Sequence, residues 1–188
     1  MSEATFEQAH LQLKLYDLRR EPRLREAREW FSEHFHPQTL DEVMKICPPG
    51  TKENAHMRQV LSYWEMVASL SNRGLVNEDL FFENSGEEWA VFQQVKPVLA
   101  GWREMFSSKK FLGNLEAHCT RLEAWREKTS PGSNAAIRKV IGQMREAAQV
   151  GKAVASEISA PEGASPAKAT GLPMLRVQKK SSADYLEV

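Results

Sequence analysis

The chain has 188 residues and carries 25 basic and 25 acidic side chains, so its formal net charge at neutral pH is zero. This balance argues against a strongly basic nucleic-acid-binding protein, and a hydrophobic content of 41% argues against a fully disordered chain. The length suits one globular domain with an additional tail.

Neither cysteine usage nor the N-terminal sequence indicates secretion. Cys47 and Cys119 lie far apart and predict no disulfide framework or zinc site. The first residues lack the basic start and apolar run of a signal peptide, and no stretch approaches the ~20 apolar residues of a membrane span. We therefore expect a cytoplasmic protein without a membrane span.

Apolar residues recur at helical spacing along most of the chain, and no segment of useful length alternates with period two. This pattern predicts an all-α fold, a single irregular bundle of about six to eight helices. The first helix carries Leu11, Leu15 and Leu18 on one stripe that we expect to face the core. The second begins at Pro22, where a missing N–H is harmless, and ends before Pro37.

The longest helix is predicted to run from Thr51, as N-cap, to Arg73, with Gly74 in the left-handed conformation after it. A short helix before it has Thr39 at its start. Between residues 60 and 70 the long helix is apolar on most faces. We therefore expect it to be the central helix of the bundle.

One narrow stripe of polar side chains interrupts that apolar surface. Its members are Arg58, Ser62, Glu65, Ser69 and Arg73. If other helices enclose the stripe, Glu65 is a buried carboxylate that needs a cation such as Arg58, Arg73 or Arg103. Otherwise the stripe is the place where the helix meets water.

The signals for the following helices are equally local. Asn77 is predicted to cap a short helix, and Ser85 with Glu88 has capping-box spacing for the next one. Pro97 lies inside that helix and is expected to kink it or to split it near residues 95–96.

The C-terminal part of the chain changes in composition. A helix is expected to close at residues 130–133, and Asn134 to cap the last helix. From about Ser156 the sequence is rich in Ala, Pro, Ser, Gly and Lys. We therefore expect an α-helical domain over residues 1–155 and a disordered tail over residues 156–188.

Five tryptophans fall on or beside apolar stripes: Trp30, Trp64, Trp89, Trp102 and Trp125. At helical spacing such residues most often pack in the core, although exposed ones can anchor a ligand or a protein partner.

Three pairs have the Glu-x-x-His spacing that carboxylate-bridged di-metal bundles use: Glu7/His10, Glu33/His36 and Glu53/His56. His36 stands beside Pro37, and His56 lies in a first helical turn, so neither position suits a metal caged inside a bundle. We expect no metal site and no cofactor.

A cluster of arginines can meet phosphate or an acidic partner: Arg19, Arg20, Arg23, Arg25 and Arg28. Interleaved glutamates at Glu21/Arg25 and Arg25/Glu29 spacing favour a solvated helix surface whose charges pair with one another. We expect no nucleic-acid binding here.

Short motifs between Arg20 and about Trp125 resemble an uncharacterised bacterial helical family, domain of unknown function 4760. The matching segments are Arg20–Pro22, Ala27–Phe31, Tyr63–Val67, Arg73–Phe81 and Trp102–Arg103. The resemblance implies an all-α fold over more than half of the chain and implies no chemistry.

No phosphate-binding glycine loop, nucleophile elbow or zinc motif occurs in the sequence. We therefore predict a non-enzymatic helical module for protein interaction or regulation. The alternative is a small-ligand-binding or enzymatic bundle that uses the polar stripe around Glu65. An enclosed polar cavity at Glu65 favours the ligand, whereas an exposed aromatic patch at Trp30, Trp89 or Trp125 favours a protein partner.

Overall fold

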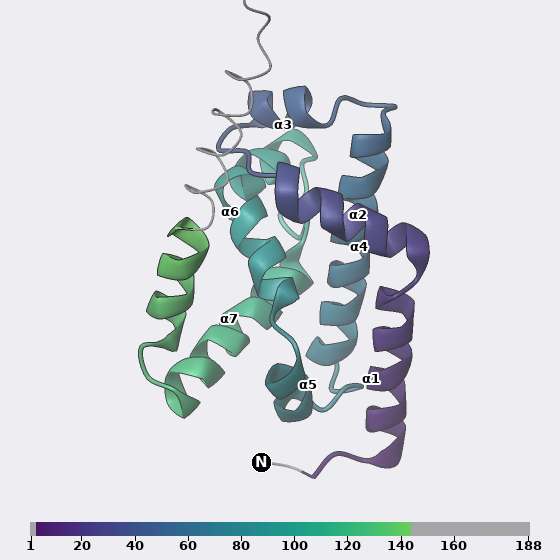
Figure 1. Cartoon of the computed structure of the whole chain (residues 1–188), viewed down its shortest axis with the longest axis vertical. Coiled ribbons are helices and arrows are strands. Elements are labelled where there is room, and N and C mark those ends of the chain that lie inside the picture. The colour runs from purple at the N-terminus through teal and green to yellow at the C-terminus, as the bar shows by residue number, and fades with distance from the viewer. Residues whose placement is uncertain (1–2, 144–188) are drawn as a thin grey trace, which may run out of the picture. The chain divides into compact units, whose positions relative to one another are not determined.

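Helices account for the regular structure of the part of the chain that the structure describes. The computed structural model describes residues 3–143, in which helices are joined by short loops and no strand occurs, so the all-α prediction is confirmed (Figure 1). The elements are α1 (Phe6–Arg19), α2 (Pro22–His34), α3 (Leu40–Ile46), α4 (Lys52–Asn72), α5 (Glu78–Asn84), α6 (Glu87–Met105) and α7 (Gly113–Thr129). A further helix begins at 133 and continues to 143.

Helix starts and ends follow the local chemistry of the sequence at several places. Thr39, Thr51 and Asn77 each accept a hydrogen bond from the backbone N–H three residues later, as predicted for N-caps. Pro22 is the first residue of α2. Gly74 has a φ of +70°, which confirms the left-handed residue expected after α4.

Two N-cap predictions are wrong, and of the two outcomes expected at Pro97, a kink or a split, the split does not occur. Gly86, not Ser85, is the N-cap of α6, because the Ser85 hydroxyl donates to the carboxylate of Glu88, 2.5 Å away. Pro97 does not split α6, which is continuous from Glu87 to Met105. Pro97 lies on the exposed side, where water can reach the carbonyl that proline leaves without a donor.

Asn134 is also not an N-cap, since the last helix has already begun at residue 133. Its side-chain amide instead donates to the backbone carbonyl of Glu123 on α7, 2.8 Å away. This bond ties the last helix back to α7.

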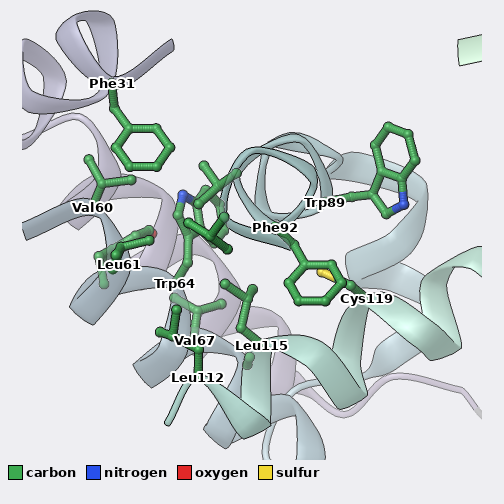
Figure 2. Close-up of a cluster of buried hydrophobic side chains, with 14 of the residues drawn as sticks. Phe31, Val60, Leu61, Trp64, Val67, Trp89, Phe92, Leu112, Leu115 and Cys119 are labelled. Atoms are coloured by element: carbon green, nitrogen blue, oxygen red, sulfur yellow. The ribbon is translucent and has the colours of Figure 1, made fainter. Parts of the chain in front are cut away.

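The longest helix, α4, is central, as predicted. It packs against α2 on one side and α7 on the other, while α6 also packs against α7. Nine of its residues are buried. Figure 2 shows Trp64 of α4 among Val60, Leu61, Val67 and Leu115, and only 1% of Trp64 is exposed to solvent.

The first helix differs from its predicted orientation. Leu15 is buried, but Leu18 is 45% exposed, so the expected stripe faces the core only in part. Tyr63 holds α1 against α4, because its hydroxyl donates a hydrogen bond to the backbone carbonyl of Leu15, 2.7 Å away.

The contacts between helices define one compact unit, which ends at Ile141. The predicted boundary at residues 155 and 156, and the tail expected beyond it, lie outside the described residues. Within residues 3–143, no helix combines the length and the apolar character needed to cross a membrane.

Candidate functional site

The polar stripe of α4 does not form an enclosed polar slot. Arg58, Ser62 and Arg73 are exposed, and Glu65 and Ser69 are partly buried. The guanidinium of Arg73 bonds the carbonyl of Ser69, one turn away on the same helix, at 2.9 Å. The stripe is thus the side of α4 that reaches solvent.

Glu65 has a partner other than a cation. Its two carboxylate oxygens accept hydrogen bonds from the backbone N–H groups of Asn114 and Leu115, at 3.1 and 2.8 Å, and from the side chain of Asn114. Arg103 pairs with Glu116 instead, at 2.7 Å. The carboxylate therefore caps the start of α7.

The five tryptophans do not gather into an exposed patch. Trp64, Trp89 and Trp102 are at most 5% exposed and belong to the core. Trp30 and Trp125 are partly buried and pack against that core. The indole N–H groups of Trp89 and Trp125 donate to carboxylates of the same unit, at 2.6 and 3.0 Å.

Exposed apolar side chains occur instead on α1. Phe6 is 80% exposed, Leu13 is 65% exposed and Tyr16 is 51% exposed. Spacings of seven and three residues place the three side chains on one face of the helix. The sequence prediction considered only the stripe of Leu11, Leu15 and Leu18 and missed this face, although Phe6, Leu13 and Tyr16 also fit a helical stripe.

An apolar groove of about 540 Å³ lies beside that face, between α1, α4 and α5. Leu13 and Tyr16 form part of its rim, and Leu80 and Phe81 of α5 line the opposite side. The groove and the exposed face of α1 are thus continuous through Leu13 and Tyr16.

A second groove, of about 620 Å³, lies between α1, α2 and α6 and is rich in arginine. Its charged lining residues are Arg19, Arg20, Arg25, Arg28, Glu29 and Glu87. Four arginines and two glutamates therefore line this groove. Tyr16 and Arg19 line both grooves and separate them.

One glutamate holds two of these arginines in place. Glu87, the first residue of α6, accepts hydrogen bonds from Arg28 through both oxygens and from Arg19 at 2.6 Å. Arg28 also donates to the backbone carbonyl of Arg19 at the end of α1, at 3.1 Å. Bonding to Glu87 raises the pKa of Arg28 above its ordinary value, so this guanidinium stays charged.

The predicted pairing of charges along α2 is wrong. Glu21 accepts a hydrogen bond from the backbone N–H of Leu24 and so caps α2. Within residues 3–143, Arg25 forms no ion pair with Glu21 or Glu29, and the guanidinium of Arg20 forms no ion pair and lies over the ring of Tyr16, 5.7 Å from its centroid. Because the carboxylate of Glu21 caps α2, it does not form the ion pair with Arg25 that their spacing of four residues predicts.

A buried histidine forms a separate polar cluster. Nδ1 of His118 lies 3.1 Å from the hydroxyl of Ser71, which donates to Glu78 at 3.2 Å. Arg121 pairs with Glu78 at 2.6 Å. Burial lowers the pKa of His118 to about 4, and the rings of Phe81 and Phe82 pack against it. This cluster is part of the core, and the second ring nitrogen of His118, Nε2, is buried there without a hydrogen-bond partner among the described residues.

The Glu-x-x-His pairs lie in three separate places, on α1, at the end of α2 and in the first turn of α4. His56 packs against Trp30, with ring centroids 5.7 Å apart. Among the described residues, no group of three or more side chains of the His, Cys, Asp and Glu types is arranged to hold a metal ion.

Comparison with known proteins identifies the family but no activity. Residues 4–122 match the family described as Domain of unknown function (DUF4760). The chain belongs to this family. The match covers α1 to α6 and most of α7, so both grooves are built from residues of the family domain. No curated protein and no solved structure matches the chain.

Proposed function

We propose that this DUF4760 domain is a non-enzymatic protein-interaction module that binds an apolar segment of another protein along α1. The observation that carries the proposal is the exposure of Phe6, Leu13 and Tyr16 on one face of α1. Exposed apolar groups that lie together beside a groove are typical of interaction surfaces.

The dimensions of this face suit a peptide segment. Phe6 and Tyr16 are ten residues apart, which corresponds to about 15 Å along a helix. The apolar groove adds a pocket beside the middle of the face, where Leu13 stands at the rim. A partner can therefore lay an amphipathic segment along α1 and insert one apolar side chain between α1 and α5.

Charge favours a partner segment with acidic residues beside its apolar ones. Lys14 in the second half of α1 and Arg20, the residue after it, are exposed, against the single carboxylate of Asp17 in the same stretch. Such complementarity mainly accelerates association and excludes basic partners. The alternative is a ligand site at the polar stripe of α4. The hydrogen bonds that Glu65 accepts from the backbone of α7 do not support it, because they occupy both carboxylate oxygens.

The test compares two substitutions of exposed apolar residues. The full chain is purified gently from its native cells, and its complexes are measured by native mass spectrometry for the wild type, Leu13→Glu and Met44→Glu. Met44 is 49% exposed on α3 and serves as the matched control. We expect a stoichiometric partner that Leu13→Glu loses and Met44→Glu retains. Equal retention in both variants, or a wild type without a partner, would overturn the proposal.

A further inference from the structure

We infer that the arginine-rich groove between α1, α2 and α6 binds an organic phosphate monoester. The inference concerns a different groove from the proposed protein contact and does not depend on it. It starts from the imbalance of charge, because four arginines line this groove with only two glutamates.

The imbalance persists after every ion pair in the groove is counted. Arg19 and Arg28 share the carboxylate of Glu87, and Glu29, whose charge also acts on Arg28, is the second carboxylate of the groove, so its six charged side chains carry a net charge of +2. Arg20 and Arg25 form no ion pair within the described residues. A dianion is therefore better matched to the groove than a monoanion, and a phosphate monoester carries close to two negative charges at pH 7.

Part of the groove is already rigid. Arg28 is fixed by both oxygens of Glu87 and by the backbone carbonyl of Arg19, and its side chain is only 18% exposed. The guanidinium of Arg19 lies over the rings of Tyr16 and Trp64, at 5.9 and 5.8 Å. Arginines held in this way lose little conformational entropy when an anion binds.

The other lining residues indicate that the anion carries an organic group. Phe31, Val60 and Val91 form an apolar floor, and Tyr16 stands at the rim. A volume of about 620 Å³ lies in the range of small-molecule sites and exceeds the needs of inorganic phosphate. Aromatic and apolar surface next to arginine forks suits a phosphate attached to a ring or an alkyl group.

Titration calorimetry on the purified full chain tests the inference with phenyl phosphate as the probe. Benzoate supplies the same ring with a single charge, and inorganic phosphate supplies the charge without the ring. We expect phenyl phosphate to bind more tightly than either, with an affinity that falls as salt is raised. Absence of binding at millimolar phenyl phosphate, or equal binding of benzoate, would overturn the inference.

Two arginine variants locate the bound phosphate. Arg25 lines this groove and not the apolar groove, whereas Arg23 is an exposed arginine on the same helix that does not line it. Arg25→Gln is expected to weaken phenyl phosphate binding by about tenfold, because it removes a charge-assisted hydrogen bond, and Arg23→Gln is expected to change it by less than about twofold. Equal weakening by both variants would show binding by net charge alone and contradict the site. No protein partner enters this experiment, so its result is separable from that of Leu13→Glu.

Discussion

The carboxylate of Glu65 on α4 accepts a hydrogen bond from the backbone N–H of Leu115 on α7, 2.8 Å away. The other oxygen accepts from the N–H of Asn114, at 3.1 Å. Leu112, the N-cap of α7, is in the left-handed conformation with a φ of 52° and offers no side-chain cap. A glutamate of the central helix therefore supplies the cap that the local sequence of α7 lacks, and it joins the two helices.

Removing this cap should destabilise the fold. We expect Glu65→Ala to lower the free energy of unfolding by about 1–2 kcal/mol, since two N–H groups at the positive end of α7 lose their acceptor. Glu65→Gln keeps an acceptor oxygen and should lose less. Urea unfolding followed by circular dichroism gives the values. Ser62→Ala, an exposed position of the same stripe, is the control, and a loss equal to that of Glu65→Ala would contradict the capping role.

Trp64 should contribute more to stability than any stripe residue. Trp64 is 1% exposed at the centre of the core, and its replacement by alanine leaves a large cavity. We expect Trp64→Ala to cost about 3–5 kcal/mol in a denaturant melt. Met66→Ala, on the same helix but 39% exposed, should cost far less. A loss near zero for Trp64→Ala would mean that α4 is not the central helix.

Stability should also depend on the protonation of His118. The pKa of His118 falls from its ordinary value of 6.5 to about 4 in the folded chain, because burial disfavours the charged ring. The unfolded chain thus binds the proton at a higher pH than the folded chain, and stability decreases as the pH falls from 6.5 towards 4. The His118 contribution to this loss between pH 7 and pH 5 is about 2 kcal/mol.

Measuring that effect requires a variant, because burial raises the pKa of Glu88 and so acts in the opposite direction. The free energy of unfolding of the wild type and of His118→Gln is measured by urea melts at pH 7 and pH 5. The Glu88 contribution is common to both proteins and cancels in the difference between them. The wild type should therefore lose more stability from pH 7 to pH 5 than His118→Gln. Nuclear magnetic resonance titration of the His118 ring gives its pKa directly. A His118 pKa near 6.5 would contradict the prediction.

Much of the fold could be predicted because its signals are local. The N-caps Thr39, Thr51 and Asn77 bond to N–H groups three residues away, and the left-handed Gly74 follows the last turn of α4. The order of the helices and the central place of α4 follow from such signals and from the apolar pattern between residues 60 and 70.

The errors arise where a side chain bonds to a partner other than the one that helical spacing assigns to it. Ser85 has the spacing of an N-cap, but its hydroxyl bonds to the carboxylate of Glu88. Arg25 has two glutamates at helical spacing, but Glu21 caps α2 and Glu87 of α6 binds Arg19 and Arg28 instead. Spacing rules describe one helix at a time, so they cannot predict the grooves that form between helices.

The candidate surfaces illustrate the same limit. Leu13 and Leu15 both fit a helical stripe, and only the packing of the folded chain buries Leu15 and leaves Leu13 exposed. The arginine cluster was evident in the sequence, but its groove requires α6, more than fifty residues later, to close it.

The most direct measurement of the central claim is site-specific photo-cross-linking in living native cells. A photoreactive phenylalanine analogue is placed at Leu13 on the exposed face of α1, or at Met44 on α3 as the control. If α1 is the interaction surface, the probe at Leu13 gives a discrete cross-linked protein and the probe at Met44 does not. Cross-linking from Met44 alone, or the same products from both positions, would contradict the account.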